Sequence, residues 1–571
     1  MKHRIKEVSF GNTAVKSLLF SSMSMLFVTY ASTVASTLIA GKIVGNNALS
    51  AINLVSPLYN YASFVSGMIG IGSSLMFFRY MGAYKKERAD KIFGQGIILA
   101  VVSGILIFIA MTVGKEAYLN SLEVSEAVRI EAECYWRFEK LFMALAPLDF
   151  LLFEMLCADT RLIIIADIVF FVSGIGSSVL LTSVYGTMGT SLGMTIGTVM
   201  CDLVLCSHFL KKNNEFTFVP HISLKDIKNM IQLALVDSST YLDSGLLITF
   251  INYFVIKHFS EEMLPIAAAM ITILDMVVVF DCVGSAFAPV AEVYLGEENY
   301  QNEKGVAKYS LGVAVKLGAA AALFFIIAAP LFPELFEIKG KVQAEVLISS
   351  IRLFAPSMLF YSISYMLISH YVAIRKITVA VLFEWIKAFI MPAICIVIFG
   401  KLFGFRGIWG GFVPAEIVAT IGFVAIISFF SKGNKSIWLL GDNDYPTFTR
   451  SYVVSESTFA TAMDDIEKFL MDEQISRGVI LKVMMTVEEM TNIIYRHNPG
   501  KKVIIQYDVS VHSDCLYLYE RDTGEEYELT NSDMDISSFS EYIFSCVIES
   551  CNYKKYLLSI GYNRSIFSFK L

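Results

Sequence analysis

Twelve apolar stretches, each close to twenty residues or longer, follow one another through the first 431 residues of the chain. A run of about 20 apolar residues is what an α-helix needs to cross the hydrocarbon core of a bilayer. The pattern therefore predicts an all-α polytopic membrane protein with 12 helices. We expect the spans at 15–40, 49–78, 92–114, 137–158, 162–183, 187–210, 229–257, 263–293, 306–332, 344–370, 376–400 and 407–431.

The glycine spacing G-x-x-G-x-x-x-G occurs once in each half of this region, and a second pair of glycine landmarks keeps a similar offset. Recurrence of two landmarks predicts two six-helix repeats, with lobes at 1–215 and 216–432. Such repeats typically hold a substrate path between them and rock against each other. Close helix packing alone is the alternative explanation. The first pattern is Gly186, Gly189 and Gly193, matched by Gly404, Gly407 and Gly411; the second is Gly70 and Gly82, matched by Gly284 and Gly296.

The composition changes after residue 432, where a polar, turn-rich linker is expected at 433–447 and a soluble domain at 448–571. Helical periodicity marks two segments, and alternating apolar residues mark two strands joined by a short turn. Helices on one face of a mainly antiparallel sheet predict an α+β sandwich. The expected helices are 455–473, 477–497 and 539–550, and the expected strands are 501–511, 515–522, 554–562 and 564–571.

The charges fit a membrane protein with cytoplasmic termini. Charged residues make up 17% of the chain, against about 25% in soluble domains. The net charge of −7 gives no indication of nucleic-acid binding, which would need a basic face. Basic loops cluster at 79–91, 211–228 and 375–376, whereas the alternate loops have few Lys and Arg. By the positive-inside rule both termini are cytoplasmic, in a multi-pass protein of the plasma membrane.

Acidic side chains inside the spans are candidates for ion or substrate coupling, because a carboxylate at mid-membrane costs about 3 kcal/mol and tends to face a cavity or a partner. Asp243, Asp275 and Asp281 lie deepest in their stretches. Asp275 and Asp281 are about 120° apart around a helix, so they need not share one site. Solvated or Lys-paired positions near helix ends are the simpler explanation for Glu154, Asp167, Asp202 and Glu416; Asp237 and Glu384 are further acids in the spans.

The segments "AGKIVGNNALSAINLVSPL", "RYMGAYKKERADK" and "VYLGEENYQNEKGVAKYS" make the first 430 residues resemble the multidrug and toxin extrusion (MATE) transporters. The resemblance implies export of organic cations or amphipathic molecules, driven by Na⁺ or H⁺. The wider superfamily includes flippases of lipid-linked sugars. One departure is Ser36, which stands where the family commonly carries an aspartate in the first span.

The segments "VEEMTNIIYRH" and "RDTGEE" make the soluble domain resemble anti-sigma-factor, histidine-kinase-like ATPase domains. The resemblance implies that Asn492 holds Mg²⁺, Glu488 activates a hydroxyl or water, Asp522 contacts adenine, and Gly524 makes room for the base of ATP. Two features depart from the family. His497 is one residue further from Asn492 than usual, and "SSFSEYIFSCVI" replaces the glycine-rich phosphate lid. A degenerate relative that binds a cytoplasmic protein partner is the alternative.

Three functions fit these features. The first is an antiporter that exports a small-molecule substrate across the bilayer, with a cytoplasmic regulatory domain. The second is a flippase of a lipid-linked precursor, which the few intramembrane Lys and Arg disfavour, since a pyrophosphate headgroup would want several. The third is a membrane-tethered serine kinase or sensor, which the missing lid disfavours. An ATP-driven pump is disfavoured because no G-x-x-x-x-G-K-[ST] loop occurs.

Overall fold

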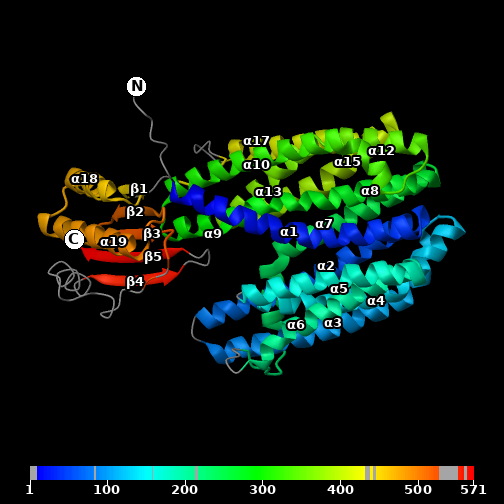
Figure 1. The fold of residues 1–571 in the computed structure, drawn as a ribbon, viewed down its shortest axis with the longest axis horizontal. Helices are drawn as coiled ribbons and strands as arrows, with labels where there is room; N and C mark the ends of the chain where they lie inside the picture. Colours follow the sequence, from blue (N-terminus) through cyan, green and yellow to red (C-terminus); the bar gives the residue numbers. More distant parts are fainter. Residues whose placement is uncertain are drawn as a thin grey trace.

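A long helical bundle carries a five-stranded sheet at one end (Figure 1). The computed structural model describes residues 9–82, 85–156, 159–211, 216–430, 437–441, 445–525, 527, 551–557 and 562–571. The bundle has two groups of helices, one drawn mainly in blue to cyan and the other in green to yellow (Figure 1). Helix α1 crosses between them, because it packs along α5 of the first group and along α9 of the second.

The first half of the bundle contains six long helices, and the second half is more interrupted. The first six are α1 (Phe10–Ile43), α2 (Asn46–Gly82), α3 (Lys86–Ser121), α4 (Glu126–Met155), α5 (Thr160–Tyr185) and α6 (Thr187–Cys206). The second half runs through α7 (Leu224–His258), α8 (Leu264–Asp275), α9 (Cys282–Gly296), α10 (Tyr300–Ala328), α11 (Phe332–Leu335), α12 (Lys341–Phe354), α13 (Ser357–Ala373), α14 (Ile377–Trp385), α15 (Met391–Phe403), α16 (Phe405–Gly410) and α17 (Phe412–Phe430).

Among the described residues, nine helices are long and apolar enough to cross a membrane, or ten if the bent pair α12–α13 is one span. The chain is thus a multi-pass membrane protein, but the predicted number of twelve is not confirmed. The two remaining predicted spans, 15–40 and 137–158, fall on α1 and α4. Side chains in the middle of α1 lie outside the described residues. Helix α4 carries many Glu, Asp, Lys and Arg along its length.

The two G-x-x-G-x-x-x-G patterns build the same local structure in both halves. Gly186 separates α5 from α6 with φ +62°, and Gly404 separates α15 from α16 with φ +68°. Only glycine adopts such a conformation readily. Three residues further on, a Cβ at Gly189 would overlap the backbone of Leu181, and a Cβ at Gly407 would overlap the backbone of Phe399. Each pattern therefore sets a tight turn and the close approach of the two helices that it joins.

The sheet is antiparallel throughout, in the order β1-β2-β3-β5-β4. The predicted antiparallel sheet is therefore confirmed. The predicted helix at 539–550 and part of the predicted strand at 554–562 lie outside the described residues. The elements of this region are β1 (Thr447–Val453), α18 (Glu456–Asp472), α19 (Arg477–His497), β2 (Ile504–Val511), β3 (Cys515–Asp522), β4 (Asn552–Leu557) and β5 (Asn563–Lys570).

The two faces of the sheet have different partners, as the period-2 alternation of strand side chains requires. On β2, Ile505, Tyr507 and Val509 pack into a hydrophobic core with α18 and α19. The intervening Gln506 and Asp508 are equally buried, but they contact the ends of α9 and α10. The apolar face of the sheet thus packs against α18 and α19, and the polar face packs against the helical bundle.

Part of the predicted linker also packs against the bundle. Trp438 is buried, and its carbonyl oxygen lies 2.9 Å from Nε2 of His370 on α13. The other ring nitrogen of His370 lies 2.9 Å from a carboxylate oxygen of Glu303 on α10. Tyr371 donates a hydrogen bond of 3.1 Å to the carbonyl oxygen of Ile437. Residues 437–441 are therefore anchored on the same end of the bundle as the sheet.

We predict that Gly189→Ala destabilises the protein by about 2 kcal/mol, because the added methyl group must push α5 and α6 apart. Thermal unfolding of the purified protein in detergent measures the effect. Gly176→Ala in α5 is the matched control, since nothing lies within 4 Å of a Cβ there. That control should leave the stability unchanged or raise it slightly through helix propensity. Equal melting curves for both variants would contradict the packing role of Gly189.

Candidate functional site

A lysine is buried in the middle of the second half of the bundle. Lys387 lies in a π-helical turn, Ile386–Ile390, between α14 and α15, and is 1% exposed. Its Nζ is 3.7 Å from Oε2 of Glu384, and 3.2 Å from the ring centre of Tyr365. Single π-turns inside α-helices are frequent at functional sites. The widened turn brings a base and an acid of one helix into the protein interior.

Three more carboxylates surround Lys387 from other helices. Asp243 of α7, Glu416 of α17 and Asp281, just before α9, each interact electrostatically with the lysine. Asp243 and Glu416 are fully buried. Asp281 is half-buried at the edge of this group, whereas the other three acids and the base share a low-dielectric interior, where unlike charges attract strongly and each uncompensated charge is costly. The buried charge cluster, by which we mean Asp243, Asp281, Glu384, Lys387 and Glu416, has an excess of negative charge.

The acids of the cluster lack their full set of hydrogen bonds. Within the described residues, neither carboxylate oxygen of Asp243 has a hydrogen-bond partner. Glu416 faces Tyr361 and Ser364, but its oxygens also lack a hydrogen bond of regular geometry within the described part of the chain. A buried carboxylate in this situation gains from a proton or a small cation. The described residues include no group of three or more His, Cys, Asp or Glu side chains placed to hold a metal ion.

The structure brings together two of the three acids that the sequence singles out. Asp243 and Asp281 face the same lysine, whereas Asp275, at the C-terminal end of α8, has no such interaction with Lys387 among the described residues. The 3₁₀ turn Met276–Asp281 separates the two aspartates. Sequence reasoning missed Lys387 and assigned Glu416 to a helix end. The available signal was the spacing of Glu384 and Lys387, three residues apart in an apolar stretch, which places both on one helical face.

The first half contains a smaller acidic pair. Asp149 of α4 and Asp202 of α6 are hydrogen-bonded to each other, with Asp167 of α5 nearby. Ser36, which replaces the aspartate expected from the resemblance, is buried in α1. Asp202 therefore lies near the end of α6 but is buried between helices rather than solvated. The described residues place no buried lysine at this pair, so it differs from the cluster around Lys387.

The residues expected to bind nucleotide lie at the other end of the molecule. Glu488 is exposed on α19 and Asn492 is half-buried there. Asp522 is buried, and its Oδ1 accepts hydrogen bonds from the backbone N–H of Gly524, at 2.6 Å, and from Asn563, at 3.2 Å.

The arrangement around Gly524 leaves little space for a base. A Cβ at Gly524 would lie 2.6 Å from Nδ2 of Asn498, so the protein's own side chain fills that side of the glycine. The replacement for the phosphate lid, "SSFSEYIFSCVI", lies outside the described residues. Binding of ATP and Mg²⁺ by Glu488, Asn492, Asp522 and Gly524 stays a prediction.

Comparison with known proteins identifies the fold of the bundle. The MatE family profile matches residues 21–182, which extend from α1 into α5. A solved structure described as the inward-facing conformation of a multidrug resistance MATE family transporter of the MOP superfamily superposes with a TM-score of 0.63. The chain has the fold of the MATE transporters. That superposition covers 73% of this chain and 99% of the transporter, at 19% sequence identity.

Two further solved structures are also similar in fold to this chain. An outward-facing MATE transporter superposes with a TM-score of 0.60 at 20% identity, over 74% of this chain and 97% of its own. A MOP superfamily transporter from Pyrococcus furiosus, described as having a binding pocket of reverse polarity, gives a TM-score of 0.60 at 20% identity, over 72% of this chain and 94% of its own. No curated protein matches the chain significantly in sequence.

We predict that Lys387→Met destabilises this MATE-fold protein by about 3 kcal/mol, because the variant leaves the surrounding carboxylates without their buried base. The double variant Lys387→Met/Glu384→Gln should recover part of the loss, since it also removes one of the acids. Thermal unfolding in detergent measures both. Lys401→Met, at an exposed lysine of α15, is the control and should change little. Additive effects of the two substitutions at 384 and 387 would contradict the pairing.

Proposed function

We propose that the protein is a secondary active exporter of amphipathic organic cations, driven by Na⁺ or H⁺, in the plasma membrane with both termini cytoplasmic. The observation that carries the proposal is the buried charge cluster, in which four carboxylates from four parts of the second half share one lysine. Its net negative charge favours binding of a cation or a proton. The MATE fold supports transport by alternating access of the two halves.

The cluster provides a means of coupling ion binding to conformation. A proton or Na⁺ that binds Asp243 neutralises one acid, so Lys387 can pair more closely with the others. Because the acids come from α7, α14, α17 and the start of α9, a change of partner for Lys387 alters the forces between these helices. An ion that binds one arrangement of the helices more tightly shifts the population toward that arrangement.

The other two functions are less well supported. A flippase of an anionic lipid-linked precursor would need several cationic groups along its path, whereas Lys387 is the one lysine buried within the described spans. A membrane-tethered serine kinase would need an ATP site, and the sequence has "SSFSEYIFSCVI" in place of the glycine-rich phosphate lid. The cationic exporter is therefore the best-supported function.

We predict that Asp243→Asn and Asp281→Asn each reduce gradient-driven transport at least tenfold, because each removes a charge that faces Lys387. Asp275→Asn is the matched control within the same part of the bundle, and should retain most of the activity. The measurement is uptake of a fluorescent cation into proteoliposomes under an imposed Na⁺ or H⁺ gradient. Full transport by both the Asp243 and Asp281 variants would exclude the cluster as the coupling site.

We further infer that the sheet regulates transport through its docked face. Arg521 of β3 is fully buried at this face, where it forms an ion pair with Glu297 at the end of α9. Its Nη1 also donates a hydrogen bond of 2.8 Å to Gln506. Tyr294 of α9 donates to the same Gln506 oxygen at 2.8 Å, and its ring lies under the guanidinium. Separating Arg521 from Glu297 is costly, because it would leave a buried charge without its main counter-charge.

The docked face reaches both halves of the bundle. On the α1 side, the backbone N–H of Phe10 donates to Oγ of Ser451 at 3.0 Å, and Ser17 is hydrogen-bonded to Tyr562 at 2.5 Å. On the other side, the N-cap residue of α10, Asn299, donates to Oδ2 of Asp508 at 2.5 Å. Relative motion of α1 against α9 and α10 therefore has to move or release the sheet.

The docked face also contains a carboxylate whose protonation should depend on docking. Burial raises the pKa of Asp508 to about 7, while hydrogen bonds from Asn299 and Thr449 and the charge of Arg564 lower it. Arg521 lies 3.7 Å away. Undocked and solvated, Asp508 should titrate near 4. The docked state therefore holds the extra proton between about pH 4 and 7, and docking weakens as the pH rises through this window.

We predict that the sheet separates from the bundle more often at pH 8 than at pH 5. Spin labels at the exposed positions Lys308 on α10 and Lys468 on α18 report the distance by pulsed electron paramagnetic resonance. Asp508→Asn should abolish the pH dependence, because the amide is neutral throughout. Asp514→Asn, in the exposed turn between β2 and β3, should preserve it. A distance distribution that does not change with pH in the unsubstituted protein would contradict the prediction.

A further inference from the structure

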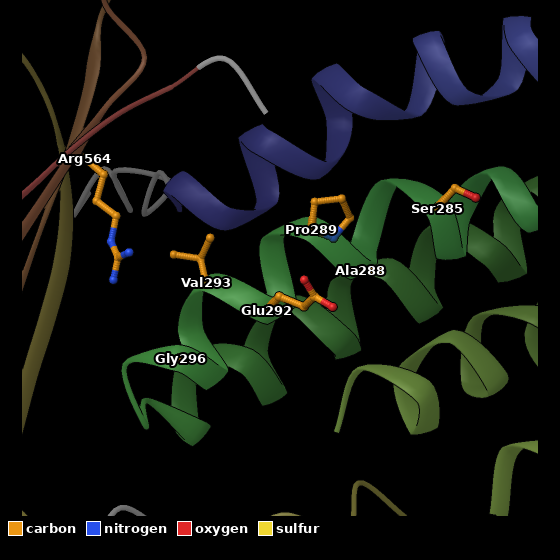
Figure 2. A pocket seen from close by; sticks show the side chains of 7 residues that line it. All are labelled: Ser285, Ala288, Pro289, Glu292, Val293, Gly296 and Arg564. Carbon is orange, nitrogen blue, oxygen red and sulfur yellow. The ribbon is translucent and has the colours of Figure 1, made fainter. Parts of the chain in front are cut away.

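Two pockets lie at opposite ends of the bundle, and they differ in charge. The first lies where the bundle meets the sheet, with a volume of about 480 Å³, and is lined by α9 and by Arg564 of β5 (Figure 2). Its arginine is paired with Glu297, and the lining also contains the carboxylate of Glu292. The single arginine of this pocket is therefore engaged within the protein.

The second pocket lies at the end of the bundle away from the sheet. Helix α10 begins beside the sheet, where Asn299 donates a hydrogen bond to Thr449, and it ends next to this pocket at Pro330. Figure 1 likewise shows α12 far from the sheet. The pocket has a volume of about 560 Å³, within the range of small-molecule sites. Its lining contains two arginines, one carboxylate and three apolar side chains, namely Arg352, Arg406, Glu345, Pro330, Ile348 and Leu353.

Positive charge predominates in the lining of this two-arginine pocket. Arg352 of α12 and Arg406 of α16 are opposed by one acid, Glu345 of α12, and all three side chains are exposed. Among the described residues, neither arginine has an ion-pair partner. Nε of Arg352 donates a hydrogen bond of 3.4 Å to the carbonyl oxygen of Ile326 in α10. This bond positions the guanidinium and leaves its two Nη groups for a ligand.

The pocket lies at the level where lipid headgroups are expected. Ile327, Leu331 and Phe403 flank it in sequence and are strongly exposed, as lipid-facing side chains of a multi-pass protein are. Arg352 precedes Arg375, the basic residue after α13 at the sheet end, by 23 residues. That length of helix spans roughly 35 Å, against about 30 Å for the hydrocarbon core of a bilayer. The two arginines at the ends of this segment therefore lie near opposite surfaces of the membrane.

We propose that the two-arginine pocket binds an anionic phospholipid of the surrounding bilayer. The phosphate diester pairs with Arg352 and Arg406, because guanidinium groups form charge-assisted and often bidentate hydrogen bonds with phosphate oxygens. Its acyl chains lie along the exposed apolar side chains that flank the pocket. The excess positive charge of the lining favours a headgroup whose only charge is the phosphate. The proposal requires a membrane-spanning bundle, but it does not depend on the exporter function.

Native mass spectrometry of the full-length protein in a neutral detergent tests the proposal through the dissociation constant of the first bound lipid. Phosphatidylglycerol should bind about tenfold more tightly than phosphatidylethanolamine with the same chains. Arg352→Gln and Arg406→Gln should each weaken phosphatidylglycerol binding about fivefold, as expected for an exposed ion pair. Lys341→Gln, at an exposed lysine of α12 outside the pocket, is the control and should change the affinity less than twofold. Equal affinities for the two lipids, or an unchanged affinity in both arginine variants, would overturn the proposal.

The acid of the pocket provides a test with the opposite sign. Glu345→Gln should tighten the binding of phosphatidylglycerol about threefold, because it removes the negative charge that repels the phosphate. General damage to the pocket would weaken binding instead. A Glu345→Gln variant that binds phosphatidylglycerol more weakly, or that loses affinity for phosphatidylethanolamine above all, would overturn the preference for an anionic lipid, since Glu345 would then serve the ammonium group of a zwitterionic one.

Competition separates a lipid from a free phosphate compound, which would offer the arginines the same chemistry. Inorganic phosphate and glycerophosphoglycerol, the headgroup without its chains, should leave phosphatidylglycerol bound at millimolar concentration, because the buried chains contribute much of the affinity. Displacement of the lipid by either compound at that concentration would show that the pocket takes a soluble phosphate, and would overturn the bilayer as the source of its ligand.

Discussion

The cost of burying charge in an apolar interior is the constraint on which the rest of this structure depends. The second half of the bundle bears that cost at Lys387 and its four carboxylates, which share this single base. A set with more acids than bases is balanced only when a proton or cation joins it. In the function that we propose, the same side chains that destabilise the interior provide its affinity for an ion.

The docked sheet follows the same rule at the end of the bundle. Arg521, Glu297 and Asp508 are buried between two parts of the chain that could each be solvated alone. Charge pairs in such an interface contribute specificity as well as affinity, because a shifted docking position would leave a charge buried without a partner. The hydrophobic face of the sheet is already covered by α18 and α19. Only the polar face remains for the bundle, and this fixes the orientation of docking.

Much of the fold is predictable from sequence because its signals are local. Long apolar runs predict the helices, and the alternation in 501–511 and 515–522 predicts β2 and β3. The glycine pattern marks both tight turns, since Gly186 and Gly404 adopt a conformation that other residues rarely do. The number of spans was harder to predict, because α4 combines membrane length with many charges.

The site was predictable only in part, because its members come from distant segments. Asp243 and Asp281 stand out as acids in apolar surroundings, but nothing local shows that they share Lys387, while Asp275 does not. Glu416 lies near the start of α17, as the sequence indicates, but its burial against Tyr361 and Ser364 and its position facing Lys387 could not be read from the sequence. The docking of the polar face could not be predicted either, since Gln506 and Asp508 have the pattern of ordinary outward-facing strand residues.

The anchoring of Trp438 on His370 limits how far the C-terminal sheet can travel. If residues 437–441 stay bound, only the five residues from 442 to 446 connect the anchor to β1, and the six Cα-to-Cα steps from 441 to 447 span at most about 20 Å. A sheet that leaves its docking surface therefore remains beside it, at an effective concentration in the millimolar range. Rebinding would compete strongly with any soluble partner. Such a partner must either bind the exposed face tightly or act on the docked state itself.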